Sequence, residues 1–325
     1  MDSASKIEHL NQIKALSDEN RMIILRQLMA KPATLTQLAN WLHHSPAWIR
    51  HHLLALEEAG LVELVEIRKR GRVTEKYYRA NAAAYLIQQW VLPKSDKPVL
   101  IFCGSHDLAL ERLAKMVSKH LQLVILAVGS LNGLINLRQG VCQMAGAHIF
   151  DSYSREYNIP TLNHLFPDRS LRVITLAQRV QGLIVATGNP KGVCGIEDLI
   201  RPDIRIVNRN EGSGTRLWFD AELKRLGIAA PNISGYDRQL YTHIQIARSI
   251  QDGVADAALG LQAAADQYGL GFIPLFEERY DLVFPNESQN ILYPILDFLA
   301  SSQFRRQSHT LSGYNLAHSG EEIKL

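Results

Sequence analysis

The amino-acid sequence predicts two parts of different fold class, an α+β part over residues 1–93 and an α/β part over residues 98–325. In the first part, short amphipathic helices followed by a hairpin with a cationic tip indicate a winged helix-turn-helix. In the second part, apolar strands that alternate with helices and glycine-rich turns indicate a parallel sheet with crossover helices. The stretch Pro-Lys-Ser-Asp-Lys-Pro at residues 93–98 has linker composition and separates the two parts.

Length and composition fit a protein with two or three folded domains. The chain has 325 residues, 46% of them hydrophobic, and a formal net charge of +3. Residues 1–93 contain 12 Lys and Arg against 9 Asp and Glu, and the remainder contains 23 of each sign. The positive excess therefore lies in the N-terminal part, although the small total does not by itself argue for a nucleic-acid partner.

The cysteines and the apolar runs bear on the compartment. Cys103, Cys142 and Cys194 lie far apart in or beside apolar runs, so we expect buried thiols in a reducing compartment. The N-terminus lacks the apolar block of a signal peptide, and no apolar run approaches the roughly 18–20 residues of a membrane helix. We therefore expect a cytoplasmic, soluble protein without a membrane partner.

Helical spacing of apolar residues predicts four helices before residue 60. They are two helices within residues 5–29, the second capped by Ser17 or Asp18, then residues 35–43 and residues 47–59. Thr34 is the expected N-cap of the third helix and Ser45 that of the fourth, with Pro46 at its first position. Gly60 then ends the fourth helix. A short helix, a sharp turn and a second helix make the helix-turn-helix pattern.

Beyond Gly60 the pattern changes to strands. Residues 61–67 and 74–79 flank a cationic loop, which predicts a hairpin whose tip reaches the DNA backbone or the minor groove. The cations of this loop are Arg68, Lys69, Arg70 and Arg72. A solvated run of charges is the alternative interpretation.

Residues 45–62, Ser-Pro-Ala-Trp-Ile-Arg-His-His-Leu-Leu-Ala-Leu-Glu-Glu-Ala-Gly-Leu-Val, resemble the recognition helix and wing entry of the arsenic-repressor-type (ArsR-like) winged-helix regulators. The resemblance implies a homodimer or higher oligomer that reads half-sites of double-stranded DNA. The DNA-contacting residues that it implies on this helix are Ser45, Trp48, Arg50 and His51. Alternatively, one of His51 and His52 packs inside and the other is solvated. Residues 34–43 lack the cysteines with which that family senses metals, so a thiolate sensor is not expected.

Residues 82–90 are expected to form one more amphipathic helix. In the family that the chain resembles, the first and last helices of this domain form a two-fold dimer. Ile7, Leu10 and Leu86 would supply the outward apolar face of such a dimer. Alternatively, these three residues belong to the core.

The turn at residues 208–216, Asn-Arg-Asn-Glu-Gly-Ser-Gly-Thr-Arg, stands out in the second part because it follows an apolar strand and precedes a helical pattern. Gly212 and Gly214 let the backbone approach a ligand closely. Ser213 and Thr215 place hydroxyls beside the free N–H groups of a helix N-terminus, which attracts anions. The alternative is an ordinary strand-to-helix turn with a Ser or Thr N-cap.

Other strands end in similar turns. Ser105 and His106 follow the expected strand at residues 99–102, and Ser130 follows the one at residues 121–128. Ligands of open α/β sheets bind at the carboxyl ends of strands, so we expect these turns to converge on one cleft. Further strands are expected at residues 147–150, 172–180, 181–187, 255–259, 272–274 and 279–284.

The second part resembles the periplasmic-binding-protein superfamily, in the branch of molybdate- and tungstate-type domains fused to helix-turn-helix regulators. The resemblance rests on Gly-Ser-His-Asp at residues 104–107, Gly-Ser-x-x-Gly-Leu at 129–134, Gly-Ala-His at 146–148, the turn at 208–216, Gly-x-Ala-Asp-x-x-Leu-Gly at 253–260 and Gly-Phe-x-Pro-Leu at 271–275. It implies two lobes that close on a ligand. Lobe one would cover about residues 98–178 and 281–325, and lobe two about residues 179–280.

The candidate ligand-binding residues are Ser105, His106, Ser130, His148, Ser213, Gly214, Thr215, Arg216 and His243. Their hydroxyl and N–H groups would donate hydrogen bonds, because a buried anion needs a full set of donors. For Arg216 the alternatives are solvent or a pair with Glu211. For the histidines the alternative is a structural hydrogen bond.

The sequence therefore predicts a one-component transcriptional regulator in which ligand-driven closure of the lobes changes the paired winged helices. The expected effector is a small anion, either an oxyanion such as molybdate or tungstate or a carboxylated metabolite in a cleft lined by Tyr153, Tyr236 or Tyr241. Neither a cofactor nor a bound metal is expected. Catalysis is not expected either, since the sequence has no Gly-x-Ser-x-Gly elbow and no metal-ligand cluster. DNA binding with a degenerate, ligandless lobe pair is a third hypothesis.

Overall fold

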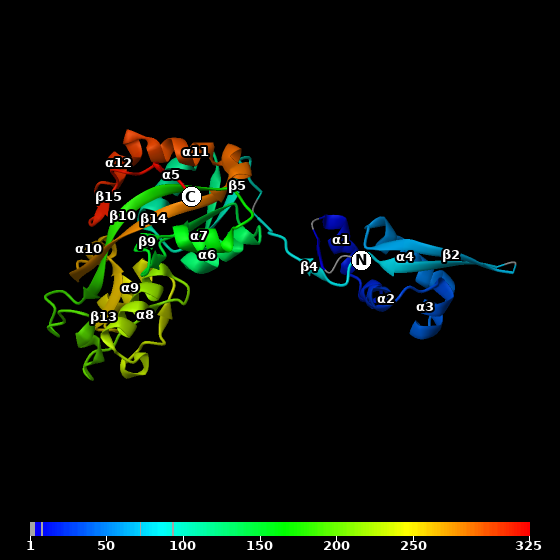
Figure 1. The fold of residues 1–325 in the computed structure, drawn as a ribbon, viewed down its shortest axis with the longest axis horizontal. Coiled ribbons are helices and arrows are strands. Elements are labelled where there is room, and N and C mark those ends of the chain that lie inside the picture. Colours follow the sequence, from blue (N-terminus) through cyan, green and yellow to red (C-terminus); the bar gives the residue numbers. More distant parts are fainter. Residues whose placement is uncertain (1–3, 8, 72, 93) are drawn as a thin grey trace. The chain divides into compact units, whose positions relative to one another are not determined.

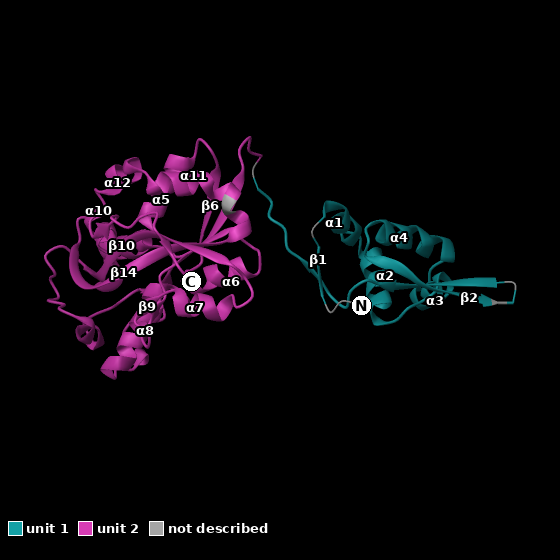
Figure 2. Cartoon of the chain, turned by 45° about the horizontal axis from the view of Figure 1, so that its top comes forward, with its two compact units in different colours: residues 1–93 teal, residues 94–325 magenta. Residues whose placement is uncertain are grey.

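The computed structural model describes residues 4–7, 9–71, 73–92 and 94–325. The chain folds into two compact units, residues 1–93 and residues 94–325 (Figure 2). Over the described ranges, no helix is both long enough and apolar enough to cross a lipid bilayer.

The first unit is a small helical bundle followed by a two-stranded hairpin (Figure 1). Its core is one cluster of buried apolar side chains from all four helices and from the base of the hairpin. Its elements are β1 (Ser5–Ile7), α1 (Leu10–Leu16), α2 (Glu19–Ala30), α3 (Leu35–Leu42), α4 (Pro46–Glu58), β2 (Val62–Arg70), β3 (Val73–Ala80) and β4 (Tyr85–Ile87).

Side-chain caps fix where the helices of the first unit begin. Asp18, rather than Ser17, caps α2 by accepting two backbone N–H groups. The predicted caps Thr34 and Ser45 are confirmed, because each side chain accepts an N–H group of the first turn of its helix. His43 adopts the left-handed conformation, with φ 57°, and ends α3. This residue makes the sharp turn between the two helices of the motif.

The predicted helix over residues 82–90 is wrong. Within that stretch, Tyr85–Ile87 is the strand β4, which pairs in parallel with β1 near the N-terminus. The Tyr85 hydroxyl donates a hydrogen bond to the carbonyl of Leu61 at 2.8 Å and ties the strand to the core. Pairing with distant residues outweighs helix formation here, because an isolated helix this short is only marginally stable.

The predicted dimer face changes with that correction. Ile7 lies on β1 rather than on a first helix, and it is buried in the core of the unit. Leu10 and Leu86 are more than half exposed, and Leu86 lies on a strand. The three residues therefore do not form one outward face on two helices.

The second unit is built on a mixed sheet with the strand order β13-β10-β14-β7-β5-β6. Its elements are β5 (Val99–Gly104), α5 (Leu108–Val117), β6 (Gln122–Ala127), α6 (Ser130–Arg138), β7 (Met144–Ala147), β8 (Phe150–Asp151), β9 (Glu156–Tyr157), α7 (Ile159–Leu165), β10 (Leu171–Val185), η1 (Ile196–Ile200), β11 (Asn208–Arg209), α8 (Gly214–Leu226), η2 (Ala230–Asn232), β12 (Gln239–Leu240), α9 (His243–Gln251), β13 (Ala257–Leu261), α10 (Gln262–Gln267), β14 (Gly271–Pro285), η3 (Asn286–Ser288), α11 (Gln289–Ala300), α12 (Ser302–Ser308), β15 (Tyr314–Asn315) and β16 (Glu322–Ile323). β5 pairs in parallel with β6 and β7, whereas β10, β13 and β14 pair antiparallel. The predicted parallel pairing therefore holds for β5, β6 and β7, whereas the antiparallel strands β10, β13 and β14 make the sheet mixed.

Two long strands join the two lobes of this unit. β10 and β14, each 15 residues long, pair from Leu171 with Pro285 to Val185 with Gly271. Toward one end β14 pairs with β7, and toward the other β10 pairs with β13. We call the lobe that holds β5–β7, α5–α7, α11 and α12 lobe one, and the lobe that holds β11–β13 and α8–α10 lobe two (Figure 1).

The sequence pattern predicts two shorter strands in place of each long one. Polar residues in the middle of each strand, Gln178 and Arg179 in β10 and Glu277 to Arg279 in β14, interrupt the apolar pattern there. In the structure these residues face one another across the paired strands, as Gln178 with Arg279 and Arg179 with Glu278. The interruption therefore marks a polar centre rather than a strand end.

The cysteines differ in exposure. Cys103 on β5 and Cys142 before β7 are buried together in the core of lobe one, as predicted. Cys194 is exposed, so its expected burial is wrong. It lies in the loop before η1, where its N–H group donates to the carboxylate of Asp198 at 2.6 Å.

Candidate ligand site and DNA-binding surface

The structure brings the candidate ligand residues together where the two lobes meet. From lobe one, Ser105 and His106 follow β5, Ser130 begins α6 and His148 follows β7. From lobe two, residues 213–216 begin α8 and His243 begins α9. All nine candidates are buried. The predicted convergence of these turns is therefore what the fold produces.

Direct contacts join the turns of the two lobes. The N–H group of Leu131 donates to the carbonyl of Gly212 at 2.9 Å. The N–H group of His243 approaches Nδ1 of His106 at 3.4 Å. The lobes are thus closed on each other at these turns.

Two glycines permit this close approach. A Cβ on Gly214 would lie 2.4 Å from the carbonyl oxygen of His148 and 2.5 Å from its ring. Gly129 has φ +92°, and a Cβ there would lie 2.8 Å from the backbone nitrogen of Ser213. A larger residue at either position would push the lobes apart.

The four candidate hydroxyls are engaged within the protein. Ser105 and Ser130 lie 3.0 Å apart through their Oγ atoms. Ser213 Oγ accepts the N–H group of Arg216 and so caps α8. Thr215 Oγ1 accepts from the side-chain amide of Gln181 at 2.9 Å. These hydroxyls therefore hold the turns in place. For Ser213, the alternative interpretation as an N-cap is confirmed.

Arg216 is buried, and its guanidinium is engaged within lobe two. Its Nε donates to the carboxylate of Asp220 at 2.9 Å rather than to Glu211. The guanidinium also lies over the ring of Tyr236, 4.1 Å from the ring centroid.

The centre of the site is a buried ion network that the sequence pattern does not predict. Arg179 is fully buried, and its guanidinium donates to Glu278 and to Asp107, at 2.6 Å in both cases. Glu278 also accepts from Gln181 at 2.8 Å and lies 2.7 Å from Nδ1 of His148. The long strands β10 and β14 supply three of these residues from their middles.

The charges of this network fix its protonation. The pKa of Glu278 falls to about 2, because burial, which raises it, is outweighed by Arg179 and His148. Burial lowers the pKa of His148, so its ring is neutral at pH 7. A neutral ring beside an ionised carboxylate carries its proton on Nδ1, which leaves Nε2 as an acceptor.

Arg209 is a second buried cation, and it has no carboxylate partner among the described residues. It is 1% exposed, and its Nη2 donates a hydrogen bond to the carbonyl of Tyr241 at 2.9 Å. Burial first, and then the charge of Arg179, lower the pKa of Arg209 to about 9. At neutral pH this guanidinium is charged and forms no direct ion pair with a described carboxylate, although the nearby Glu278 offsets part of its charge.

The two remaining histidines lie side by side, with ring centroids 6.0 Å apart. His106 Nε2 lies 2.9 Å from Glu111, and its Nδ1 faces the N–H group of His243. His243 is fully buried, and burial lowers its pKa well below the ordinary value. Both rings therefore border the site, and that of His243 is neutral at pH 7.

Several buried polar atoms in this region have no hydrogen-bond partner within the described structure. They are Arg179 Nη2, Arg209 Nε and Nη1, His148 Nε2, Gln181 Oε1, Asn210 Oδ1, and Nδ1 and Nε2 of His243. Each such atom opposes folding by about 1–3 kcal/mol when it is left unpaired. A cluster of such atoms where two lobes meet is typical of a small polar binding site.

The sequence held a signal for the missed residues. Arg179 and Gln181 interrupt an otherwise apolar run that predicts a buried strand, and Glu278 does the same in the second long strand. A charge in such a run requires a buried partner, which is a reason to search for one.

The tyrosines expected in the cleft are elsewhere. Tyr153 is 99% exposed and Tyr241 is 55% exposed. The Tyr236 hydroxyl donates to Asp220 at 2.6 Å, beside Arg216. The expectation of a tyrosine-lined cleft is therefore wrong, and the atoms around the buried cluster are mainly those of arginine, histidine and amide groups.

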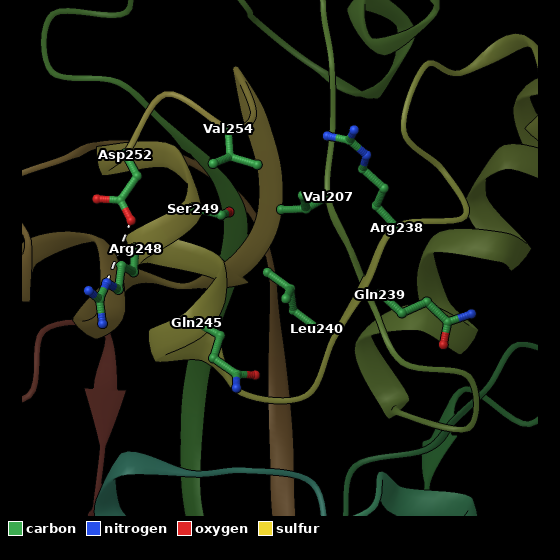
Figure 3. A pocket seen from close by; sticks show the side chains of 9 residues that line it. All are labelled: Val207, Arg238, Gln239, Leu240, Gln245, Arg248, Ser249, Asp252 and Val254. Carbon is green, nitrogen blue, oxygen red and sulfur yellow. Dashed lines mark ion pairs between the residues drawn. The ribbon is translucent and has the colours of Figure 1, made fainter.

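A separate pocket of about 440 Å³ lies in lobe two (Figure 3). It is lined by Val207, Arg238, Gln239, Leu240, Gln245, Arg248, Ser249, Asp252 and Val254. Its charged groups include the exposed pair Arg248 and Asp252, 3.5 Å apart. Because water solvates that pair, its charges need no ligand to compensate them, unlike the buried polar atoms of the cluster.

α4 presents the residues expected to contact DNA. Arg50 and His51 are exposed, and so is Ser45 at the N-cap. Trp48 is half-buried and stacks on the ring of His44, with centroids 3.7 Å apart. Arg50 is thus free to reach a guanine edge or a phosphate.

The opposite side of α4 faces the core. Ile49, Leu53 and Leu56 are at most 2% exposed, as the helical spacing predicts. His52 is also buried, whereas His51 is exposed, which matches the alternative that one packs and the other is solvated.

β2 and β3 form the predicted wing and pair from Val62 with Ala80 to Arg70 with Val73. Arg68 donates to Glu66 at 2.6 Å and lies over the ring of Tyr77, and Lys69 is exposed. The predicted contact residue Arg72 lies outside the described residues, and for Arg70 only the backbone is described.

Together, a helix-turn-helix with a wing and a two-lobed domain around a polar cluster define a regulator that joins a DNA-binding unit to a ligand-binding unit. Comparison with family models agrees. The model of the PBP superfamily domain matches residues 111–299, and that of the bacterial regulatory protein, arsR family, matches residues 18–63. The chain belongs to the PBP superfamily and carries an arsR-family DNA-binding region at its N-terminus.

Two curated proteins are similar to this chain in sequence. The chain is 31% identical over 280 residues to the uncharacterized protein YvgK of Bacillus subtilis (strain 168), covering 82% of this chain and 91% of YvgK. It is 33% identical over 110 residues to an uncharacterized protein encoded in the 5' region of a ferredoxin 2Fe-2S gene of Clostridium pasteurianum, covering 33% of this chain and 97% of that protein.

Among solved structures, a putative phosphate ABC transporter substrate-binding protein from Clostridium perfringens, with bound phosphate, is 16% identical with a TM-score of 0.49. That match covers 70% of this chain and 99% of the other.

Proposed function

We propose that this protein is a transcriptional regulator whose two-lobed unit senses a small anion and whose winged helix binds double-stranded DNA. The DNA-binding and ligand-binding classes rest on the arsR-family and PBP-superfamily matches. The observation that supports an anionic ligand is Arg209, a buried guanidinium that donates to the carbonyl of Tyr241 and has a lowered pKa.

An anion would complete this site. The unpartnered Nη2 of Arg179 and the unpartnered Nε and Nη1 of Arg209 are donors on two fully buried cations. Charge-assisted hydrogen bonds from guanidinium groups to oxyanions or carboxylates are stronger than hydrogen bonds between neutral groups. The proposed class therefore includes tetrahedral oxyanions, such as molybdate or tungstate, and small carboxylated metabolites.

Closure of the lobes links the two units. The anion would be held between Arg179 on the shared strand β10 and Arg209 on lobe two, so it favours the closed arrangement. A ligand shifts a conformational equilibrium only by its differential affinity for the two states, and an anion between the lobes has such a difference. In a homodimer, closure would change the spacing of two recognition helices and hence the affinity for paired half-sites. The protein would act by binding rather than by catalysis.

The test is thermal unfolding of the purified chain with molybdate, tungstate, phosphate, sulfate and small carboxylates. We expect one class of anion to raise the melting temperature, because ligands that bind only the folded state stabilise it. Binding to a duplex selected from a random-sequence pool is then measured with and without that anion. The expected result is a change in DNA affinity.

Arg209→Met is the variant for this test, and Arg225→Met is its control, since Arg225 is exposed and pairs with Glu222 on the surface of α8. The first change should abolish the response to the anion, and the second should preserve it. An anion response that survives Arg209→Met would remove this residue from the site. Identical DNA binding with and without a bound anion would contradict the regulatory role.

A further inference from the structure

The buried site presents hydrogen-bond acceptors as well as cations. Gln181 Oε1 and His148 Nε2 are both buried and lack a donor partner in the described part of the chain. Both residues contact the same carboxylate, that of Glu278, and both lie against the turn at the start of α8. Their free atoms therefore belong to the cluster that holds Arg179.

The orientation of the Gln181 amide is fixed by its neighbours. Its Nε2 lies 2.8 Å from Glu278 Oε1 and 2.9 Å from Thr215 Oγ1. Glu278 is ionised and can only accept, so the amide nitrogen must be the atom that faces it. A flipped amide would place two acceptors in contact, and Oε1 is therefore the unpaired atom.

The same carboxylate fixes the tautomer of His148. Its Nδ1 lies 2.7 Å from Glu278 Oε2 and must carry the proton that the carboxylate accepts. Burial disfavours a second proton on the ring. The Nε2 atom is thus a lone pair in a buried place, and a donor is needed to satisfy it.

An anion with acceptor oxygens alone would satisfy the arginines but would leave both of these atoms unpaired. We propose that the anion recognised by this site carries its own hydrogen-bond donor, a hydroxyl group that is accepted by Gln181 Oε1 or His148 Nε2. This inference rests on the proposed function, in which the site binds an anion at Arg209. Hydrogen phosphate, hydrogen arsenate and 2-hydroxycarboxylates have this chemistry, whereas sulfate, molybdate and tungstate at neutral pH do not.

The test is isothermal titration calorimetry of the full chain at pH 7.5 with two matched pairs of anions, phosphate against sulfate and glycolate against acetate. The members of each pair differ in whether a hydroxyl donor is present. We expect the hydroxyl-bearing member of one pair to bind at least about tenfold more tightly, since a buried acceptor left unpaired weakens binding by that order. A preference within the first pair assigns an inorganic anion, and one within the second assigns a hydroxycarboxylate.

Gln181→Met tests the acceptor directly. We expect it to reduce the preference for the hydroxyl-bearing anion by about tenfold while binding of its partner changes less. Gln178→Met is the control, because Gln178 lies on the same strand, is half-buried and accepts from Asn315 outside the cluster. The wild-type comparison of paired anions stands even where the variant fails to fold.

The outcomes separate this inference from the proposed function. Tighter binding of sulfate, molybdate or tungstate than of every hydroxyl-bearing anion would overturn the inference and leave the anion sensor intact. An unchanged preference in a folded Gln181→Met protein would overturn the role of this acceptor. Failure of all these anions to bind the wild-type chain would overturn both proposals.

Discussion

Replacement of Arg209 by Met should make the ligand-free protein more stable. Burial lowers the pKa of Arg209 to about 9, and at 1.36 kcal/mol per pKa unit the fall from the ordinary value corresponds to about 5 kcal/mol that opposes burial of the charged form. The variant loses the hydrogen bond to Tyr241, a contribution of about 1 kcal/mol. Replacement of buried ions by apolar groups stabilises proteins by about 1–4 kcal/mol. We therefore expect the free energy of unfolding to rise by about 4 kcal/mol, and the melting temperature of a unit of this size to rise by roughly 12 °C.

Urea unfolding of the wild-type and variant chains without anion measures this difference, with Arg225→Met as the exposed control. The dependence on pH gives a second check. The folded-state pKa of Arg209 lies below its unfolded-state value, so the opposing contribution is complete below pH 9 and fades as the pH rises further. The difference in the free energy of unfolding between the variant and the wild type should therefore become smaller as the pH rises above 9. A variant that is no more stable than the wild type at pH 7.5 would refute the argument that this cation is uncompensated.

Two further predictions address closure and DNA contact. Gly214→Ala places a Cβ 2.4 Å from the carbonyl oxygen of His148, so calorimetry and DNA titration should show loss of anion binding with DNA binding retained. Gly195→Ala, whose Cβ would meet a flexible carboxylate, should leave anion binding unchanged, and equal binding in both variants would contradict the closure argument. Lys69→Ala removes an exposed cation of the wing, so the slope of log K against log salt should fall in magnitude by about 0.9 for each wing that contacts a phosphate. An unchanged slope would mean that the wing does not contact phosphate.

The sequence predicts those features that depend on neighbouring residues. Thr34 and Ser45 cap their helices because the capping interaction spans three residues. The Gly-Ser-Gly-Thr turn begins α8 for the same reason. Features that depend on distant partners are not predicted correctly. Residues 82–90 have helical spacing, but β4 forms because it pairs with β1, about 80 residues earlier in the chain.

The candidate site was predicted in its turns but not in its charges. Hydroxyl and glycine positions follow from local turn chemistry, and the structure places them at the meeting of the lobes. The roles of Arg179 and Arg209 depend on which charges meet after folding, and no local pattern encodes that. Arg179 meets Glu278 across 99 residues, whereas Arg209 meets no carboxylate among the described residues. Arg216, one of the candidate ligand contacts, instead pairs with Asp220 one turn along its own helix.

The two long strands have a consequence for the order in which a ligand would be held. Arg179, Gln181 and Glu278 lie on β10 and β14, which both lobes share, and Asp107 and His148 lie on lobe one. Separation of the lobes would therefore leave this ion network assembled and would withdraw mainly Arg209 and its neighbours on lobe two. An arriving anion would meet a preformed half-site that already has its orientation and its acceptors. Arg209 would then be attracted by the charge of the bound anion and would hold the lobes closed.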